Sequence, residues 1–177
     1  MSYKLTCFPI RGLPEPIRLV LFVDQGIKFA DDRINTNDWP SMKSHFSGAI
    51  LRHLARKHSN CFVRNLHTKY AKMIYQAYYT EKDSYIKDIL SVELAKFEKL
   101  LVTRDDEKNF ILGDKISYVD FVLFEELDIH QILDPHCLDR FPLLKAYHQR
   151  MEDRPGLKEY CEQRNAAKIL VNGNGKR

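Results

Sequence analysis

The apolar positions of this chain follow a short strand pattern at the start and a helical spacing almost everywhere else. Residues 3–8 and 27–34 alternate loosely, which predicts two short strands. Between them, the segment 14–25 carries prolines in its first turn, where a missing N–H costs little, and Gly26 follows its expected end. A strand, a helix and a strand in this order predict a βαβ unit with two parallel strands.

The region after these strands is predicted to be helical over most of its length. A short irregular helix is expected over 39–46, and Ser47 is a suitable N-cap for the next helix. From about Val63 onward, apolar residues recur at helical spacing, interrupted by a polar loop at 103–109. The pattern therefore predicts an α+β chain that is mostly α.

Three later helices have recognisable starts. Ser117 and Asp120 form a capping-box-like pair, with Asp in place of the usual Glu, before the apolar run 121–127. Two further helices are expected to begin at 141–144 and at Pro155. Because they match a helix-start signal, Ser117 and Asp120 are interpreted as structural residues.

The size and charge of the chain narrow the functional classes. With 177 residues, of which 44% are hydrophobic, it suits one large domain or two small ones. The formal net charge of +4 is spread along the chain without a run of like charge, which argues against nucleic-acid binding. No segment approaches the roughly 18 apolar residues that a membrane span requires. We therefore expect neither a nucleic-acid nor a membrane partner.

The four cysteines are widely spaced and contain no CxxC pair. They are Cys7, Cys61, Cys137 and Cys161. This spacing argues against a zinc site and against a disulfide framework. We expect no bound metal and a reducing, cytoplasmic setting.

Four segments of the chain carry a resemblance to a known family. They are 3–13, with Cys7 where the first strand ends, 116–120 (Ile-Ser-Tyr-Val-Asp), 138–144 (Leu-Asp-Arg-Phe-Pro-Leu-Leu) and 171–176 (Val-Asn-Gly-Asn-Gly-Lys). Together they resemble a Pi-class glutathione S-transferase, especially the nematode members, over nearly the whole chain. The resemblance implies the glutathione-transferase fold: a truncated thioredoxin-like, glutathione-binding unit over 1–58, followed by an all-helical domain over 59–177.

The chain departs from the family by two missing stretches. Phe46 joins Ser47 directly, where the family has a Gly-Gln-Leu-Pro step and two antiparallel strands, and a second stretch is absent between Asn60 and Val63. In the family, a cis-proline in the missing step presents a backbone edge to glutathione. The remaining two-stranded parallel sheet is expected to be barely stable.

The position of Cys7 decides what chemistry the resemblance implies, because the family has there the Tyr that activates glutathione. One interpretation is a thiol facing a helix N-terminus, with a lowered pKa, that forms a mixed disulfide with glutathione. The other is a small, half-buried and inert cysteine. In both, a Cys S–H is a much weaker donor than a Tyr hydroxyl, so we expect conjugation to be impaired.

The resemblance also implies a set of substrate-binding residues. On the glutathione side these are Phe8, Arg11, Trp39, Lys43, Ser47 and Asn65, the last standing where the family has an Asp; on the electrophile side they are Phe8, Ile10, Tyr75 and the Gly173 region. Structural alternatives stay open for several of them. Trp39 is equally suited to an apolar anchor, Lys43 to a solvated charge, Ser47 to a bare N-cap and Tyr75 to a tyrosine cluster in the core or an interface.

By this resemblance the chain is a glutathione transferase that joins glutathione to small hydrophobic electrophiles in detoxification. Glutathione is a co-substrate, and no cofactor is expected. The family forms homodimers; here the dimer is expected to be weakened, because the stretch lost after Phe46 carries its aromatic key. Two alternatives remain: a non-catalytic member of the fold that binds ligands, and a thiol oxidoreductase that depends on Cys7.

Overall fold

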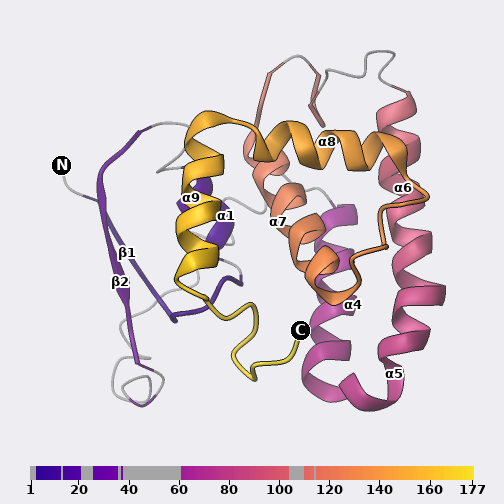
Figure 1. The fold of residues 1–177 in the computed structure, drawn as a ribbon, viewed down its shortest axis with the longest axis horizontal. Helices are drawn as coiled ribbons and strands as arrows, with labels where there is room; N and C mark the ends of the chain where they lie inside the picture. Colours follow the sequence, from indigo (N-terminus) through magenta and orange to yellow (C-terminus); the bar gives the residue numbers. More distant parts are fainter. Residues whose placement is uncertain are drawn as a thin grey trace.

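The two predicted strands form one parallel pair in the structure, a computed structural model that describes residues 3–12, 14–20, 26–35, 37, 61–103, 110–113 and 115–177. Strand β1 (Tyr3–Cys7) pairs with β2 (Phe29–Arg33), in a register that places Tyr3 beside Phe29 and Cys7 beside Arg33. Figure 1 shows the pair at one edge of the molecule, beside α1 (Glu15–Arg18) and α9 (Pro155–Ala166). The parallel βαβ prediction is confirmed.

The helix between the strands is described only in its first part. Helix α1 begins after Pro14, as predicted, and residues 21–25 of the predicted helix lie outside the described residues. Gly26 has φ +59°, the left-handed conformation expected of a residue that ends a helix. The helix expected over 39–46, the N-cap at Ser47 and the boundary near residue 58 also lie outside the described residues.

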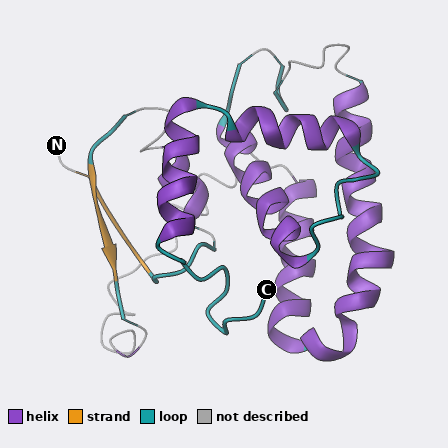
Figure 2. Cartoon of the chain, viewed as in Figure 1, coloured by secondary structure: helices purple, strands orange, loops and turns teal. Residues whose placement is uncertain are grey.

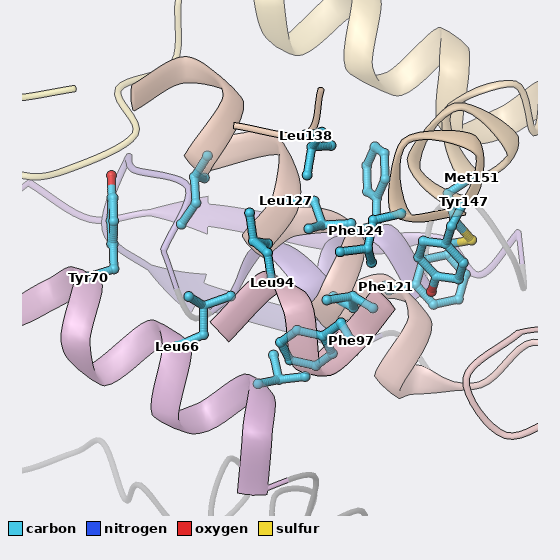
Figure 3. Packing of buried hydrophobic residues seen from close by; sticks show 14 of the residues in the cluster. Leu66, Tyr70, Leu94, Phe97, Phe121, Phe124, Leu127, Leu138, Tyr147 and Met151 are labelled. Carbon is cyan, nitrogen blue, oxygen red and sulfur yellow. The ribbon is translucent and has the colours of Figure 1, made fainter. Parts of the chain in front are cut away.

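Most of the rest of the described chain is helical, as the spacing predicts (Figure 2). Its elements are α4 (Cys61–Gln76), α5 (Tyr78–Ser84), the π-helical segment η4 (Tyr85–Leu90), α6 (Ser91–Val102), α7 (Tyr118–Leu133), α8 (Pro142–Glu152) and α9. Helix α7 is central: side chains from α4, α6 and α8 converge on Phe121, Phe124 and Leu127 of this helix (Figure 3). A helix that packs against several others is expected to be apolar around most of its circumference. Most residues of α7 are apolar.

The start of α7 carries the predicted capping box. The side chain of Asp120 accepts hydrogen bonds from Ser117 N and Ile111 N, both at 2.8 Å, and from Tyr147 Oη at 2.8 Å. Asp120 is fully buried, so each of these donors satisfies part of a carboxylate that has lost its water. The structural interpretation of Ser117 and Asp120 is confirmed.

Several contacts among the described residues join the N-terminal unit to the helices. Helix α1 packs on α7, and Leu19 belongs to the main hydrophobic core. The loop after β1 meets the C-terminal tail, where Arg11 N donates to Leu170 O at 3.0 Å and Ile10 pairs with Leu170. Figure 1 shows this tail running from the foot of α9 to a point beside α4.

Candidate functional site

Cys7 lies at the carboxyl end of β1, half-buried, in contact with a buried arginine. Arg18 Nη2 donates to Cys7 Sγ, and Arg18 itself is 0% exposed. Its other nitrogens donate to Asp31 Oδ1 at 3.1 Å and to Glu15 Oε2 at 2.9 Å. The thiol is therefore one end of a chain of charged groups rather than an isolated side chain.

The environment of Cys7 keeps its sulfur protonated. Burial raises the pKa of the Cys7 thiol, and the nearby Arg18 guanidinium lowers it by less, so the pKa lies above its ordinary value. The interpretation that predicts a lowered pKa is wrong, because loss of water outweighs the cation.

Arg11, which the resemblance places on the glutathione side with a mainly structural and electrostatic role, points its guanidinium into the protein. Its Nε and Nη2 donate to the two carboxylate oxygens of Glu125, each at 2.8 Å, and Nη2 also contacts Asp128. Burial lowers the pKa of Arg11, but these carboxylates raise it by more, so the guanidinium stays charged. Its N–H donors bind carboxylates of α7. Arg11 therefore stabilises the fold and is not positioned to contact a ligand directly.

Sequence reasoning missed the network to which Arg11 belongs. Its members are Arg11, Arg18 and Arg164 with Glu15, Asp31, Glu125 and Asp128. Glu125 and Asp128 sit three positions apart within α7, which puts both on one face. Acids within and just after the apolar run 121–127 were the available signal, because buried charges require partners.

The C-terminal tail brings the predicted electrophile-side residues together. Gly173 N donates to Tyr75 Oη at 3.1 Å, and Tyr75 is 51% exposed on α4. The same tail pairs with Ile10 through Leu170, next to the half-buried Phe8 in the loop after β1. Tyr75, Gly173 and Ile10 thus belong to one continuous set of contacts.

Other predicted site residues are less informative. Asn65 is exposed on α4, while Trp39, Lys43 and Ser47 lie outside the described residues. Two shallow cavities, of about 170 Å³ beside α6 and η4 and about 280 Å³ between α7 and α8, are lined by neither Cys7 nor Tyr75. Within the described part of the chain no group of three His, Cys, Asp or Glu side chains is placed to hold a metal ion, and no helix is long and apolar enough to cross a membrane.

Comparison with known proteins gives a consistent set of relatives. Residues 64–164 match the family of the glutathione S-transferase C-terminal domain. Glutathione S-transferase 2 of Onchocerca volvulus is 62% identical over 99% of this chain and 100% of its own length, and a glutathione S-transferase of Dirofilaria immitis is 59% identical over the same shares. The solved structure of the Onchocerca volvulus Pi-class glutathione S-transferase has a TM-score of 0.90 and 61% identity, covering 100% of both chains.

These alignments also bear on the missing stretches. Both alignments with the nematode proteins extend over 208 positions, whereas this chain has 177 residues. The relatives therefore contain positions that face no residue of this chain, as the sequence comparison with the family predicts.

Proposed function

We infer that this chain, which belongs to the Pi class of the glutathione S-transferase family, is a glutathione transferase that conjugates glutathione slowly. In the conjugation reaction the glutathione sulfur loses its proton and attacks an electrophilic carbon. A C–S bond forms while a leaving group departs or a ring or double bond opens. The substrates we propose are small hydrophobic electrophiles, with glutathione as co-substrate.

The observation that carries the slow rate is the state of Cys7. A group at this position has to donate a hydrogen bond to the glutathione sulfur and so favour its thiolate. Cys7 offers a short and weak S–H donor, and its own sulfur already accepts from Arg18. Losing one strong donor to a developing anion costs about 2.7–4 kcal/mol, or roughly 10²–10³ in rate.

The electrophile side keeps a suitable hydroxyl. Tyr75 Oη accepts the hydrogen bond from Gly173 N, so its own hydrogen remains available to an oxygen on the electrophile. Half of the Tyr75 side chain faces solvent, which supports access by a small molecule. We propose Phe8 and Ile10 as the apolar part of this side.

On the glutathione side we propose Phe8, Trp39, Lys43, Ser47 and Asn65. Arg11 supports this side through the fold, because its donors are engaged by Glu125 and Asp128. The chain is also proposed to form a weak homodimer and to work in the cytoplasm. The free thiols of Cys7, Cys137 and Cys161 support a reducing compartment.

Retention on a glutathione column and two rate assays test this proposal. We expect the purified chain to bind the column, to conjugate an aryl halide slowly, and to reduce a glutathione mixed disulfide no faster than a Cys7→Ser variant. Conjugation no faster than the uncatalysed rate, together with failure to bind the column, would instead indicate a non-catalytic member of the fold. Disulfide reduction that disappears in Cys7→Ser would indicate the oxidoreductase alternative, which requires a thiolate that burial disfavours.

A further inference from the structure

The segment 169–177 is held across α4 and α5 by a buried asparagine. Asn172 is 6% exposed, and its Nδ2 donates to Tyr70 Oη and to Lys176 O, each at 2.8 Å. Tyr70 is buried in α4, and burial raises the pKa of Tyr70 to about 12, so its hydroxyl is neutral and accepts the bond. Asn172 therefore links the tail to Tyr70 in the core, and it also makes a contact within the tail, to Lys176.

A second set of contacts fixes the tail on the other side of Gly173. Asn174 Nδ2 donates to Ile74 O at 3.0 Å, and Tyr78 Oη donates to Arg177 O at 2.5 Å. Gly173 lies between Asn172 and Asn174, so the hydrogen bonds of these two asparagines set the direction of its N–H. That N–H points to Tyr75 Oη at 3.1 Å.

The direction of this bond has a chemical consequence for Tyr75. A tyrosine hydroxyl has one hydrogen to donate and lone pairs to accept. When Gly173 N–H occupies a lone pair, the hydroxyl oxygen is fixed in place and its hydrogen is left to donate elsewhere. In opening an epoxide, the glutathione sulfur forms the C–S bond, the C–O bond breaks, and the epoxide oxygen takes the Tyr75 proton. Tyr75 then regains a proton from water.

We propose that Asn172 is a positioning residue for the reaction: through the tail it holds Gly173 N–H on Tyr75 Oη and so aims the Tyr75 hydrogen at an oxygen on the electrophile. This inference rests on the proposed function, because it assigns Tyr75 to the electrophile side. It adds a residue that acts on the reaction through the orientation of Tyr75.

Activity toward two electrophiles separates positioning from a general structural role. An epoxide has an oxygen that accepts the Tyr75 proton, whereas a benzyl halide releases halide and needs no such donor. Asn172→Ala should lower kcat for the epoxide by about five- to tenfold, the effect of one hydrogen bond, and change the benzyl halide rate by less than about twofold. In a Tyr75→Phe background, Asn172→Ala should change neither rate. Asn165→Ala, at an exposed position of α9, is the matched control.

Amide hydrogen exchange at Gly173 gives a readout that does not need activity. The Gly173 N–H should be protected in the unmodified chain, and exchange at least about tenfold faster in Asn172→Ala and in Tyr75→Phe, with no change in Asn165→Ala. If exchange responds in this way but neither electrophile is conjugated, the proposed function fails while the positioning of Tyr75 by Asn172 stands. Unchanged exchange in Asn172→Ala, or equal losses with both electrophiles that persist in Tyr75→Phe, would show that Asn172 has no positioning role.

Discussion

Arg164 on α9 donates to Glu15 on α1, with 3.0 Å between Nη1 and Oε1, although 149 positions of sequence separate the two residues. The same Nη1 donates to Glu125 Oε2 at 3.0 Å, and Nη2 donates to Asp128 Oδ2 at 2.8 Å. One buried guanidinium therefore joins the N-terminal unit, the central helix and the last helix. The described sheet of the N-terminal unit has only two strands, so this link is a main attachment of that unit to the helices.

Removing that guanidinium is predicted to destabilise the protein strongly. Arg164→Ala leaves Glu15, Glu125 and Asp128 with less compensation in the interior, and breaking a buried pair from one side costs about 3–5 kcal/mol. Urea unfolding followed by circular dichroism measures the loss. Lys158→Ala, at an exposed site on the same helix, is the control and should change the free energy of unfolding by less than about 0.5 kcal/mol. Equal values for the two variants would refute the role given to Arg164.

The contact between His67 and Glu126 is predicted to make the free energy of unfolding depend on pH. His67 Nδ1 lies 2.7 Å from Glu126 Oε1; burial lowers the pKa of His67, but Glu126 raises it by more, so it is above the ordinary value. A histidine whose pKa is higher in the folded state than in the unfolded state stabilises the fold fully below the unfolded-state pKa of about 6.5. This contribution is lost as pH rises through the folded-state pKa.

The measurement is the difference in unfolding free energy between the unmodified chain and His67→Gln. It should be larger at about pH 5.5 than at about pH 9. Burial lowers the pKa of His130, and the nearby His67 lowers it further, so the part of the His130 titration that depends on His67 stays in the difference. A difference that does not change with pH, or that grows at alkaline pH, would contradict the assignment.

The helical part is predicted to be the more stable part of the molecule. Residues 84–103 and 115–160 include the packed core around α7, whereas β1 and β2 have no further strand within the described residues. Hydrogen exchange should therefore be slow in α6 and α7 and fast in the strands, by at least about a hundredfold. Uniform protection across the chain would mean that the network around Arg164 holds both parts as one cooperative unit.

Association between copies is predicted to be weak. The resemblance implies that the aromatic key of the family dimer belongs to the stretch lost after Phe46, and a standard-sized interface without its central anchor loses much of its affinity. Sedimentation at micromolar concentration should show mostly monomer. A dimer that survives dilution would point to another surface, and the tyrosines of α4 and α5 are the first to examine; Tyr75 is 51% and Tyr79 is 86% exposed.

Local signals predicted more of this structure than long-range ones. The parallel strands, the capping box of Ser117 and Asp120, and the helix starts at Pro142 and Pro155 depend on a few neighbouring residues. The arginine partners of Glu125 and Asp128 could not be predicted in this way, because Arg11 and Arg164 lie more than thirty positions away on either side.

The candidate site was predicted in part, by resemblance rather than by pattern. Tyr75 and the Gly173 region do meet, but the direction of the hydrogen bond between them depends on how the tail is held. Of the two interpretations of Cys7, the raised pKa contradicts the one with a lowered pKa, because a strand end and a nearby helix give no measure of how much water the fold removes from a thiol. The inward orientation of Arg11 likewise depends on the partners that α7 supplies.

The central claim is that Cys7 limits conjugation, and the conjugation rate of Cys7→Tyr with glutathione and an aryl halide tests it most directly. Restoring a strong hydroxyl donor should raise kcat by roughly a hundredfold, within the range expected for one donor to a developing thiolate. Cys137→Ser, a change at a thiol remote from this position, should leave the rate unchanged. If the unmodified chain already conjugates as fast as Cys7→Tyr, Cys7 does not limit the reaction and the claim is wrong.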